Sequence, residues 1–320
     1  MRVVFMGTPQ FAIPSLRALL GSDDCQVVGV VTQPDRSVGR KQVCTPTPVK
    51  QVALQHGIPV LQPIRLRAPE AVDAVHRLKP DLIVTAAYGQ LIPDDILTLP
   101  RYRCLNVHAS LLPRYRGGAP IHWALIRGER ETGVTIMIMV KELDAGDMVA
   151  QVAIPIEPSD DVGTLHDRLS QVGAELLLFI VPAWSSGDLS PVPQDPEKVT
   201  YAPNVKRLDE RLDFFQQTAQ ELSYRVRGLS PWPGAFLQRA NREIWKVWEV
   251  CWRPATTTLG SGYVTSIDRD QGVLWLGAKQ DELGLLTIQP AGKRRLPMRD
   301  WLRGHSVDVG DRWILPGVVG

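Results

Sequence analysis

The chain has few cysteines, no long apolar run and no strong charge of either sign. Its 320 residues include four cysteines, and none of these forms a Cys-x-x-Cys pair. This spacing argues against a disulfide framework or a thiolate zinc site, and it fits a reducing compartment. No apolar run approaches the roughly 20 residues that cross a bilayer, and the apolar start of the chain is too short for a signal peptide. We therefore expect a cytoplasmic protein with no membrane contact.

Several nucleotide and metal motifs are also missing. Where a dinucleotide-binding fold carries Gly-x-Gly-x-x-Gly, this chain has only Gly7-Thr8-Pro9, and Pro9 removes an amide proton. The sequence contains no Walker motif, no paired-histidine zincin motif and no Gly-x-Ser-x-Gly elbow. We therefore expect neither a pyrophosphate cradle nor a metal requirement.

The net charge is only +2, but it is unevenly distributed. Residues 1–204 carry a net charge of −2, whereas residues 205–320 carry +4 and seven of the nine tryptophans. A modestly basic, Trp-rich tail allows contact with a polyanion, although it is far from a basic nucleic-acid stripe. The alternative is a small barrel that uses tryptophan as core filler, and composition alone favours this alternative.

The first half of the chain alternates β-rich runs with helical patterns. The pattern predicts strands over 3–6, 27–32, 82–86 and 104–108, and helices over 14–20, 47–56 and 69–78. This alternation indicates an α/β fold with an open, mostly parallel, Rossmann-like sheet. Ligands of such sheets bind outside the carboxyl ends of the strands. Further strands over 134–140 and 149–156 and a helix over 164–181 close the domain.

The pattern changes towards the carboxyl end. Residues 183–204 are rich in Pro, Ser, Asp and Gly, which is typical of a linker. Beyond residue 205, short runs separated by turns predict a small, OB-like β-barrel. We therefore expect two domains, over residues 1–182 and 205–320, joined by a linker over 183–204. No heptad or apolar patch suggests an interface, so we expect a monomer.

Two polar side chains suited to carbonyl chemistry lie at the end of the predicted strand 104–108. Asn106 and His108 are two residues apart, so they point to the same side of a strand. The amide can hold a developing oxyanion, and the ring can hold or move a proton. A carboxylate from Asp144 or Asp147 that faced His108 would fix its tautomer and favour its charged form. A packed histidine and a solvated Asp-Ala-Gly-Asp turn explain the same residues.

The segment 33–50 is too long for an ordinary connection between a strand and a helix. It contains the basic residues Arg36, Arg40 and Lys41 among glycine and several prolines. A long, basic loop at the ligand edge suits a large anionic partner. A solvated surface excursion explains the composition equally well.

Taken together, these segments resemble the methionyl-tRNA formyltransferase family along nearly the whole chain. The most specific stretches are 106–120, which contains Asn-Val-His and Ser-Leu-Leu-Pro, and 142–147, which reads Glu-Leu-Asp-Ala-Gly-Asp. The resemblance implies that 10-formyltetrahydrofolate is the formyl donor and that initiator methionyl-tRNA is the acceptor. It implies a catalytic trio of Asn106, His108 and Asp144. It also implies a folate-binding segment made of Ser110, Leu111, Leu112 and Pro113.

Three further stretches, 33–50, 201–204 and 231–235, favour a tRNA acceptor over a small one within this resemblance. The candidate tRNA-binding residues are basic: Arg36, Arg40, Lys41, Lys206, Arg207 and Arg225, with Lys293, Arg294 and Arg295 as further candidates. Three other functions compete. These are formyl transfer to a small amine, such as an amino sugar nucleotide or glycinamide ribotide, hydrolysis of 10-formyltetrahydrofolate, and RNA binding without catalysis.

Overall fold

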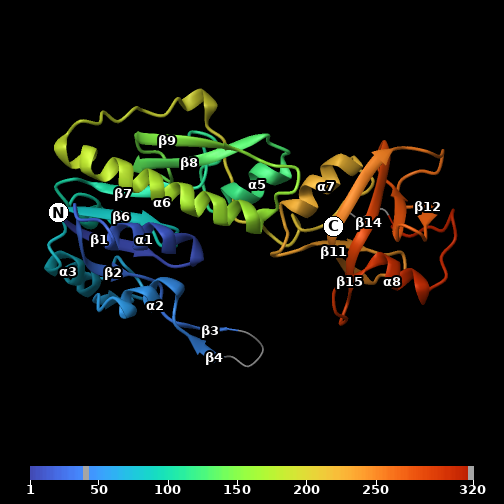
Figure 1. Cartoon of the computed structure of the whole chain (residues 1–320), viewed down its shortest axis with the longest axis horizontal. Helices are drawn as coiled ribbons and strands as arrows, with labels where there is room; N and C mark the ends of the chain where they lie inside the picture. The colour runs from blue at the N-terminus through green and yellow to red at the C-terminus, as the bar shows by residue number, and fades with distance from the viewer. Residues whose placement is uncertain (39–42, 316–320) are drawn as a thin grey trace. The chain divides into compact units, whose positions relative to one another are not determined.

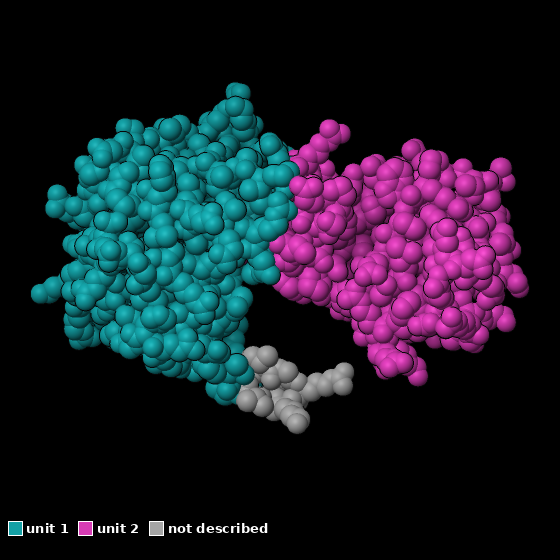
Figure 2. All heavy atoms as spheres, in the orientation of Figure 1, with its two compact units in different colours: residues 1–120, 131–155, 166–203 teal, residues 121–130, 156–165, 204–320 magenta. Residues whose placement is uncertain are grey.

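The computed structural model describes residues 1–38 and 43–315, except for the side chains of residues 38 and 43. The chain forms two compact units, which Figure 2 colours separately. Unit 1 comprises residues 1–120, 131–155 and 166–203, and unit 2 comprises residues 121–130, 156–165 and the chain from residue 204 onwards. Two short segments that precede residue 166 therefore belong to the second unit.

Unit 1 is built on a seven-stranded sheet in the order β5-β2-β1-β6-β7-β8-β9 (Figure 1). Its strands are β1 (Arg2–Gly7), β2 (Gln26–Val31), β5 (Val60–Leu61), β6 (Leu82–Ala86), β7 (Cys104–His108), β8 (Glu131–Ile138) and β9 (Met148–Pro155). The first five strands in this order pair in parallel, and β8 and β9 are antiparallel. This pairing confirms the predicted open, mostly parallel sheet. The sheet forms in this way because buried apolar strands alternate with helices along the sequence.

Helices occupy most of the connections in unit 1. They are η1 (Gln10–Ala12), α1 (Ile13–Leu20), α2 (Pro48–Gln55), α3 (Pro69–Arg77), α4 (Asp94–Leu97), α5 (Pro120–Ile126), α6 (Val162–Ser186) and η2 (Pro196–Lys198), of which α5 and α6 also extend into unit 2. The predictions for α1, α2 and α3 are confirmed to within one residue at each end. Each of these three helices has a proline in its first turn, where a missing amide proton costs no helical hydrogen bond.

The two faces of strand β7 have different neighbours. Cys104 belongs to a buried cluster with residues of β1, β6, α3 and α4. On the opposite face, Gly173 of α6 lies so close that a Cβ there would be 2.8 Å from Cγ1 of Val107. Because side chains alternate along a strand, Asn106 and His108 lie on the face of Cys104, away from α6. The expectation that Asn106 and His108 share one face is therefore correct.

Helix α6 continues beyond the predicted end at residue 181. It runs to Ser186 and contains Pro182, a residue that normally ends or kinks a helix. Trp184 anchors this extension, since its Nε1–H donates to the carbonyl of Tyr102 at 2.8 Å. Residues 183–186, expected to be linker, are therefore helical.

Among the described helices, α6 is the one that is long and apolar enough to cross a membrane, by length and composition only. Its Leu165, Leu169 and Leu177 are fully buried inside the protein. A core helix of a globular domain has the same composition, because one of its faces lies against a sheet.

The long segment 33–50 contains a hairpin instead of an irregular loop. Strand β3 (Arg36–Val38) pairs in antiparallel with β4 (Val43–Thr45), and Figure 1 shows this hairpin projecting beyond α2. At its base, Asp35 accepts hydrogen bonds from Lys50 at 2.5 Å and from Gln62 at 2.6 Å. These bonds hold the pKa of the Asp35 carboxyl below its usual range. The hydrogen bonds of Asp35 therefore fix the position at which the hairpin leaves the sheet.

Unit 2 contains a six-stranded antiparallel sheet in the order β10-β11-β14-β13-β12, with β15 paired to β14. Its elements are α7 (Ala219–Arg227), β10 (Ala235–Gln238), β11 (Ile244–Pro254), β12 (Val264–Asp268), β13 (Val273–Gly277), β14 (Asp281–Pro290), β15 (Leu296–Pro297) and α8 (Met298–Arg303). This antiparallel architecture agrees with the predicted small barrel-like domain. Helices α7 and α8 lie outside the predicted elements, although the capping box of Thr218 and Glu221 marks the start of α7.

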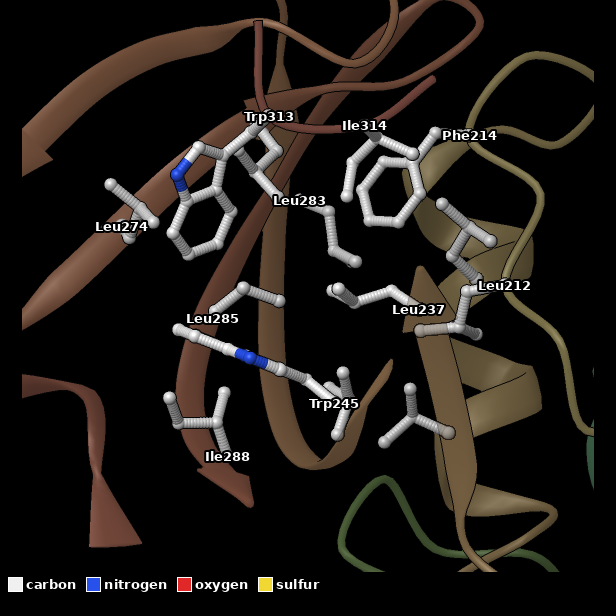
Figure 3. Packing of buried hydrophobic residues seen from close by; sticks show 14 of the residues in the cluster. Leu212, Phe214, Leu237, Trp245, Leu274, Leu283, Leu285, Ile288, Trp313 and Ile314 are labelled. Carbon is white, nitrogen blue, oxygen red and sulfur yellow. The ribbon is translucent and has the colours of Figure 1, made fainter. Parts of the chain in front are cut away.

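Tryptophan fills the core of unit 2, part of which Figure 3 shows. Trp245, Trp301 and Trp313 are buried and meet edge to face, with ring centroids 5.1–5.6 Å apart. The guanidinium of Arg239 lies 4.7 Å from the ring of Trp245 and 4.5 Å from that of Trp313. The core-filler interpretation is therefore correct for these three tryptophans, whereas Trp252 is exposed.

Candidate functional site

Strand β7 places Asn106 between two neighbouring strands. It pairs with Thr85 of β6 and with Met137 of β8. The hydroxyl of Thr85 donates to Oδ1 of Asn106 at 2.7 Å, so the amide has a fixed orientation. Among the described residues, none accepts a hydrogen bond from Nδ2 of Asn106. The amide group of Asn106 therefore retains a donor for a ligand.

The imidazole of His108 is 6% exposed and lies between two acceptors. Its Nε2 is 3.0 Å from the carbonyl oxygen of Tyr115, and because a carbonyl only accepts, Nε2 carries the proton of this hydrogen bond. Its Nδ1 is 3.7 Å from Oδ2 of Asp144, which is within ion-pair range but too long for a hydrogen bond. A carboxylate at this distance stabilises positive charge that develops on the ring.

Asp144 reaches the site from the connection between β8 and β9. Another residue of this connection, Met139, has its sulfur 3.2 Å from the hydroxyl of Thr85. The connection therefore crosses the face of the sheet that carries Asn106 and His108. The amide of Gly117 donates to Oδ2 of Asp144 at 2.8 Å, which aims the carboxylate. Asp147, the other candidate, is exposed.

The segment Ser110–Pro113 is fixed by polar groups of β8 and β9. The hydroxyl of Thr135 donates to the carbonyl of Ser110 at 2.6 Å and accepts from the amide of Leu112 at 3.1 Å. Nε2 of Gln151 donates to the carbonyl of Leu112 at 2.7 Å. The side chains of Ser110 and Leu112 are buried in the protein and so hold this segment in place.

The basic candidates belong to both units of the chain. Arg36 is exposed on the β3–β4 hairpin, and Arg40 and Lys41 lie outside the described residues. In unit 2, Lys206 is exposed, whereas Arg207 pairs with Glu210. Lys293, Arg294 and Arg295 are exposed as well.

Arg225 is a less accessible candidate. It is half-buried, its Nη1 donates to the carbonyl of Asp209 at 2.5 Å, and burial lowers the pKa of its guanidinium. Its contacts are those of a residue that holds unit 2 together.

Several residues of the site escape the sequence analysis. Thr85 and Thr135 are polar residues inside otherwise apolar strands, and this position is the signal that could have found them. The carbonyl of Tyr115 and the amide of Gly117 act through the backbone, which gives no sequence signal. Gln194, described below, lies in the predicted linker. Among residues 1–38 and 43–315, no group of three or more His, Cys, Asp and Glu is placed to hold a metal ion.

The comparison with known families covers both units. Residues 1–181 match the formyl transferase family model, and residues 204–306 match the model of the formyl transferase C-terminal domain. The methionyl-tRNA formyltransferase of Bacillus subtilis is 51% identical over 312 residues, covering 97% of this chain and 96% of that protein. The enzyme of the same name from Bacillus pumilus is 51% identical over 311 residues, covering 97% of both chains.

Solved structures show the same fold at low identity. The N-formyltransferase of Helicobacter canadensis, in complex with folinic acid and dTDP-3-aminofucose, has a TM-score of 0.64 at 16% identity and covers 90% of this chain and 98% of its own. HypX from Aquifex aeolicus in complex with tetrahydrofolic acid has a TM-score of 0.60 at 19% identity and covers 97% of this chain and 50% of its own. With the two family matches and the full-length relatives, these findings show that the chain belongs to the methionyl-tRNA formyltransferase family.

Proposed function

We propose that this enzyme transfers a formyl group from 10-formyltetrahydrofolate to the α-amine of initiator methionyl-tRNA. The likeness to methionyl-tRNA formyltransferases over 97% of the chain is the observation that carries the proposal. The local geometry supports it, since Asn106, His108 and Asp144 lie together at one end of strand β7. An amide donor beside an imidazole suits a reaction at a carbonyl carbon.

In the proposed reaction, the amine nitrogen attacks the formyl carbon and a new C–N bond forms. The carbonyl π electrons move to the oxygen, which becomes an oxyanion. The bond from carbon to N10 of the folate then breaks, its electron pair goes to N10, and a proton from the amine ends on N10. Asn106 donates to the oxyanion through Nδ2, the donor that Thr85 leaves free. One such donor contributes about 3–4 kcal/mol to the stability of the transition state.

His108 carries the proton in this proposal. Its Nε2–H donates to the carbonyl of Tyr115. In the reaction, the oxyanion accepts from the same Nε2–H, either together with this carbonyl or in its place. Nδ1 faces Asp144, whose carboxylate compensates the positive charge of a doubly protonated ring. The pair can therefore hold the amine proton until N10 accepts it.

The formyl donor is proposed to lie against the backbone of Ser110–Pro113. Its flat pterin ring needs apolar contacts, and the neighbouring connections expose three large apolar side chains. After strand β6, Leu91 is 79% exposed, and between β8 and β9, Val140 and Leu143 are 38% and 55% exposed. These two connections meet where Nζ of Lys141 lies 4.0 Å from Oδ2 of Asp94. A ring that covered the three side chains would remove apolar surface from water.

The tRNA is proposed to bind through its phosphates. Its candidate contacts are basic residues of the segment 33–50 and of unit 2. Arg295 also lies 4.7 Å over the ring of Trp248, an arrangement that suits stacking with nucleic acid. The residues proposed for these contacts are Arg36, Arg40, Lys41, Lys206, Arg207 and Arg225, with Lys293, Arg294 and Arg295.

We further propose that the enzyme works in the cytoplasm as a monomer. Its donor and acceptor are both soluble and both needed where protein synthesis begins. Sedimentation of the purified chain tests the monomer, and a species of twice the 35.5 kDa mass would contradict it.

The experiment that tests the function combines the enzyme, 10-formyltetrahydrofolate and charged initiator tRNA. We expect formylmethionyl-tRNA, and we expect Asn106→Ala and His108→Ala to reduce turnover by about 10²–10³. His76→Ala is the control, because His76 is exposed on α3. Formate released without tRNA would indicate hydrolysis instead, and formylation of an amino sugar nucleotide in place of the tRNA would indicate a small acceptor. Near-normal turnover of Asn106→Ala or His108→Ala would contradict the assigned roles.

A further inference from the structure

Both residues that face the ring of His108 have an unusual backbone. Tyr115, whose carbonyl accepts from Nε2, has φ 63°, and Asp144, whose carboxylate faces Nδ1, has φ 48°. These values lie in the left-handed region, which residues other than glycine seldom adopt. Such conformations persist only where the surrounding structure holds them. Contacts with the surrounding structure therefore hold both loops in place.

Gln194 contacts both loops with a single side chain. Its Nε2 donates to the carbonyl of Asp144 at 2.8 Å and to that of Gly146 at 2.7 Å. Its Oε1 accepts from Nε and Nη2 of Arg116, at 2.9 and 2.7 Å. Both N–H groups and both lone pairs of the amide are used, so its orientation is fully determined.

The chain after Gln194 holds the first loop in a second way. Thr200 accepts from the amide of Tyr115 through Oγ1 and from the amide of Arg116 through its carbonyl, both at 2.9 Å. A Cβ at Gly117, which has φ 124°, would lie 2.6 Å from the carbonyl oxygen of Ala202. The loop that carries Tyr115 is therefore pinned to residues 200–202, and Gln194 extends this support to Asp144.

We propose that Gln194 is a positioning residue of the catalytic site. It ties the backbone of Asp144 to Arg116, so that the Asp144 carboxylate and the Tyr115 carbonyl face the two nitrogens of His108 at the same time. The proposal rests on the formyl transfer proposed above. Gln194 does not touch the reacting atoms, and it acts through the position of Asp144.

The test uses two substitutions in the full chain. Gln194→Met removes all four hydrogen bonds at nearly constant volume, and Gln194→Glu keeps the acceptor for Arg116 but loses both donors to the loop of Asp144. We expect kcat to fall about tenfold or more in each variant, because small displacements of catalytic groups are costly. KM for both substrates should change by less than about threefold, since Gln194 itself belongs to neither proposed binding surface. Asp195→Ala is the control, because among the described residues its carboxylate contacts its own turn and Lys198 and neither of the two loops.

Two further measurements separate positioning from general support of the fold. In an Asp144→Asn background, Gln194→Glu should reduce kcat by less than about twofold, because the group that it positions is already disabled. The ¹⁵N resonances of the His108 ring should shift in Gln194→Glu and in Asp144→Asn, and should remain unchanged in Asp195→Ala. The ring signal requires no substrate and no turnover.

Each contrary result has a definite meaning. Wild-type kcat in Gln194→Glu, or an equal loss of kcat with and without Asp144, would overturn the positioning role. Unchanged ring resonances in Gln194→Glu would overturn it as well, even if Gln194→Met fails to fold. If the wild-type chain makes no formylmethionyl-tRNA, the proposed function fails, whereas the ring resonances still decide the role of Gln194.

Discussion

The hydroxyl of Thr85 decides how Asn106 presents its amide. Thr85→Val replaces this buried hydroxyl with a methyl group and removes the 2.7 Å hydrogen bond to Oδ1. Thr85 also approaches the carbonyl of Leu105 at 3.3 Å and the sulfur of Met139 at 3.2 Å, but its single proton favours the shortest contact. A neutral hydrogen bond contributes about 1 kcal/mol. Losing it lets the amide of Asn106 rotate, and about 1 kcal/mol corresponds to a roughly fivefold slower chemical step.

The assay is single-turnover formation of formylmethionyl-tRNA with both substrates saturating. Thr85→Ser keeps the hydroxyl and should react at nearly the wild-type rate. Asn106→Ala should lie far lower, by about 10²–10³, because it loses the donor itself. In the Asn106→Ala background, Thr85→Val should have no further effect, since the two residues act through one amide. A wild-type rate for Thr85→Val, or an undiminished effect without Asn106, would refute the orienting role.

Three other perturbations have defined outcomes. A Cβ at Gly133 would lie 2.1 Å from a carbonyl oxygen of β9, so Gly133→Ala should lower the free energy of unfolding, measured by calorimetry, by about 2 kcal/mol. Gly304→Ala is the control, because a Cβ there enters open space and should leave the free energy of unfolding unchanged. Burial raises the pKa of the Glu282 carboxyl, but hydrogen bonds from Thr256 and Arg253 outweigh it and hold the net pKa below the usual range. The ionised Glu282 carboxylate therefore contributes to the free energy of unfolding in full above the unfolded pKa of about 4.3, and this contribution is lost as the pH falls through the lower pKa of the folded state. Glu282→Gln should make the free energy of unfolding less dependent on pH in this acid range. An unchanged pH dependence would contradict this prediction. Asp144→Asn should lower kcat at constant melting temperature, because an amide cannot compensate a charged ring, and full activity would remove Asp144 from the mechanism.

The resemblance in the sequence predicted the chemistry of the site, and the spacing of residues predicted part of its geometry. Asn106 and His108 had to share a face, because residues two apart in a strand always do. Spacing alone left the Asp144–Asp147 pair ambiguous, since either carboxylate could reach a histidine 36 or more positions away in the chain, and only the resemblance pointed to Asp144. The antiparallel return of β8 and the course of its connection to β9 select Asp144 and leave Asp147 exposed.

Elements with weak local signals were the ones that escaped the sequence analysis. Strand β3 pairs with β4, and the two-residue strand β5 pairs with β2. The periodicity of apolar residues in a short segment does not reveal such partners. The continuation of α6 past Pro182 depends on Trp184, which is anchored on Tyr102 from a distant part of the sequence. Composition indicated a linker at 183–204, yet Gln194 and Thr200 of that stretch contact the loops that carry Tyr115 and Asp144.

The sequence by itself determined the alternation of strands and helices, the shared face of Asn106 and His108, and the family to which these motifs point. Those features depend on local periodicity and on residue identity, which a single chain displays directly. Tertiary structure alone decided which hydroxyl orients Asn106 and which glutamine holds the loops, and how Asp144 comes to face His108. These choices depend on backbone carbonyls and amides brought together from up to 85 positions apart, and backbone groups are the same in every residue.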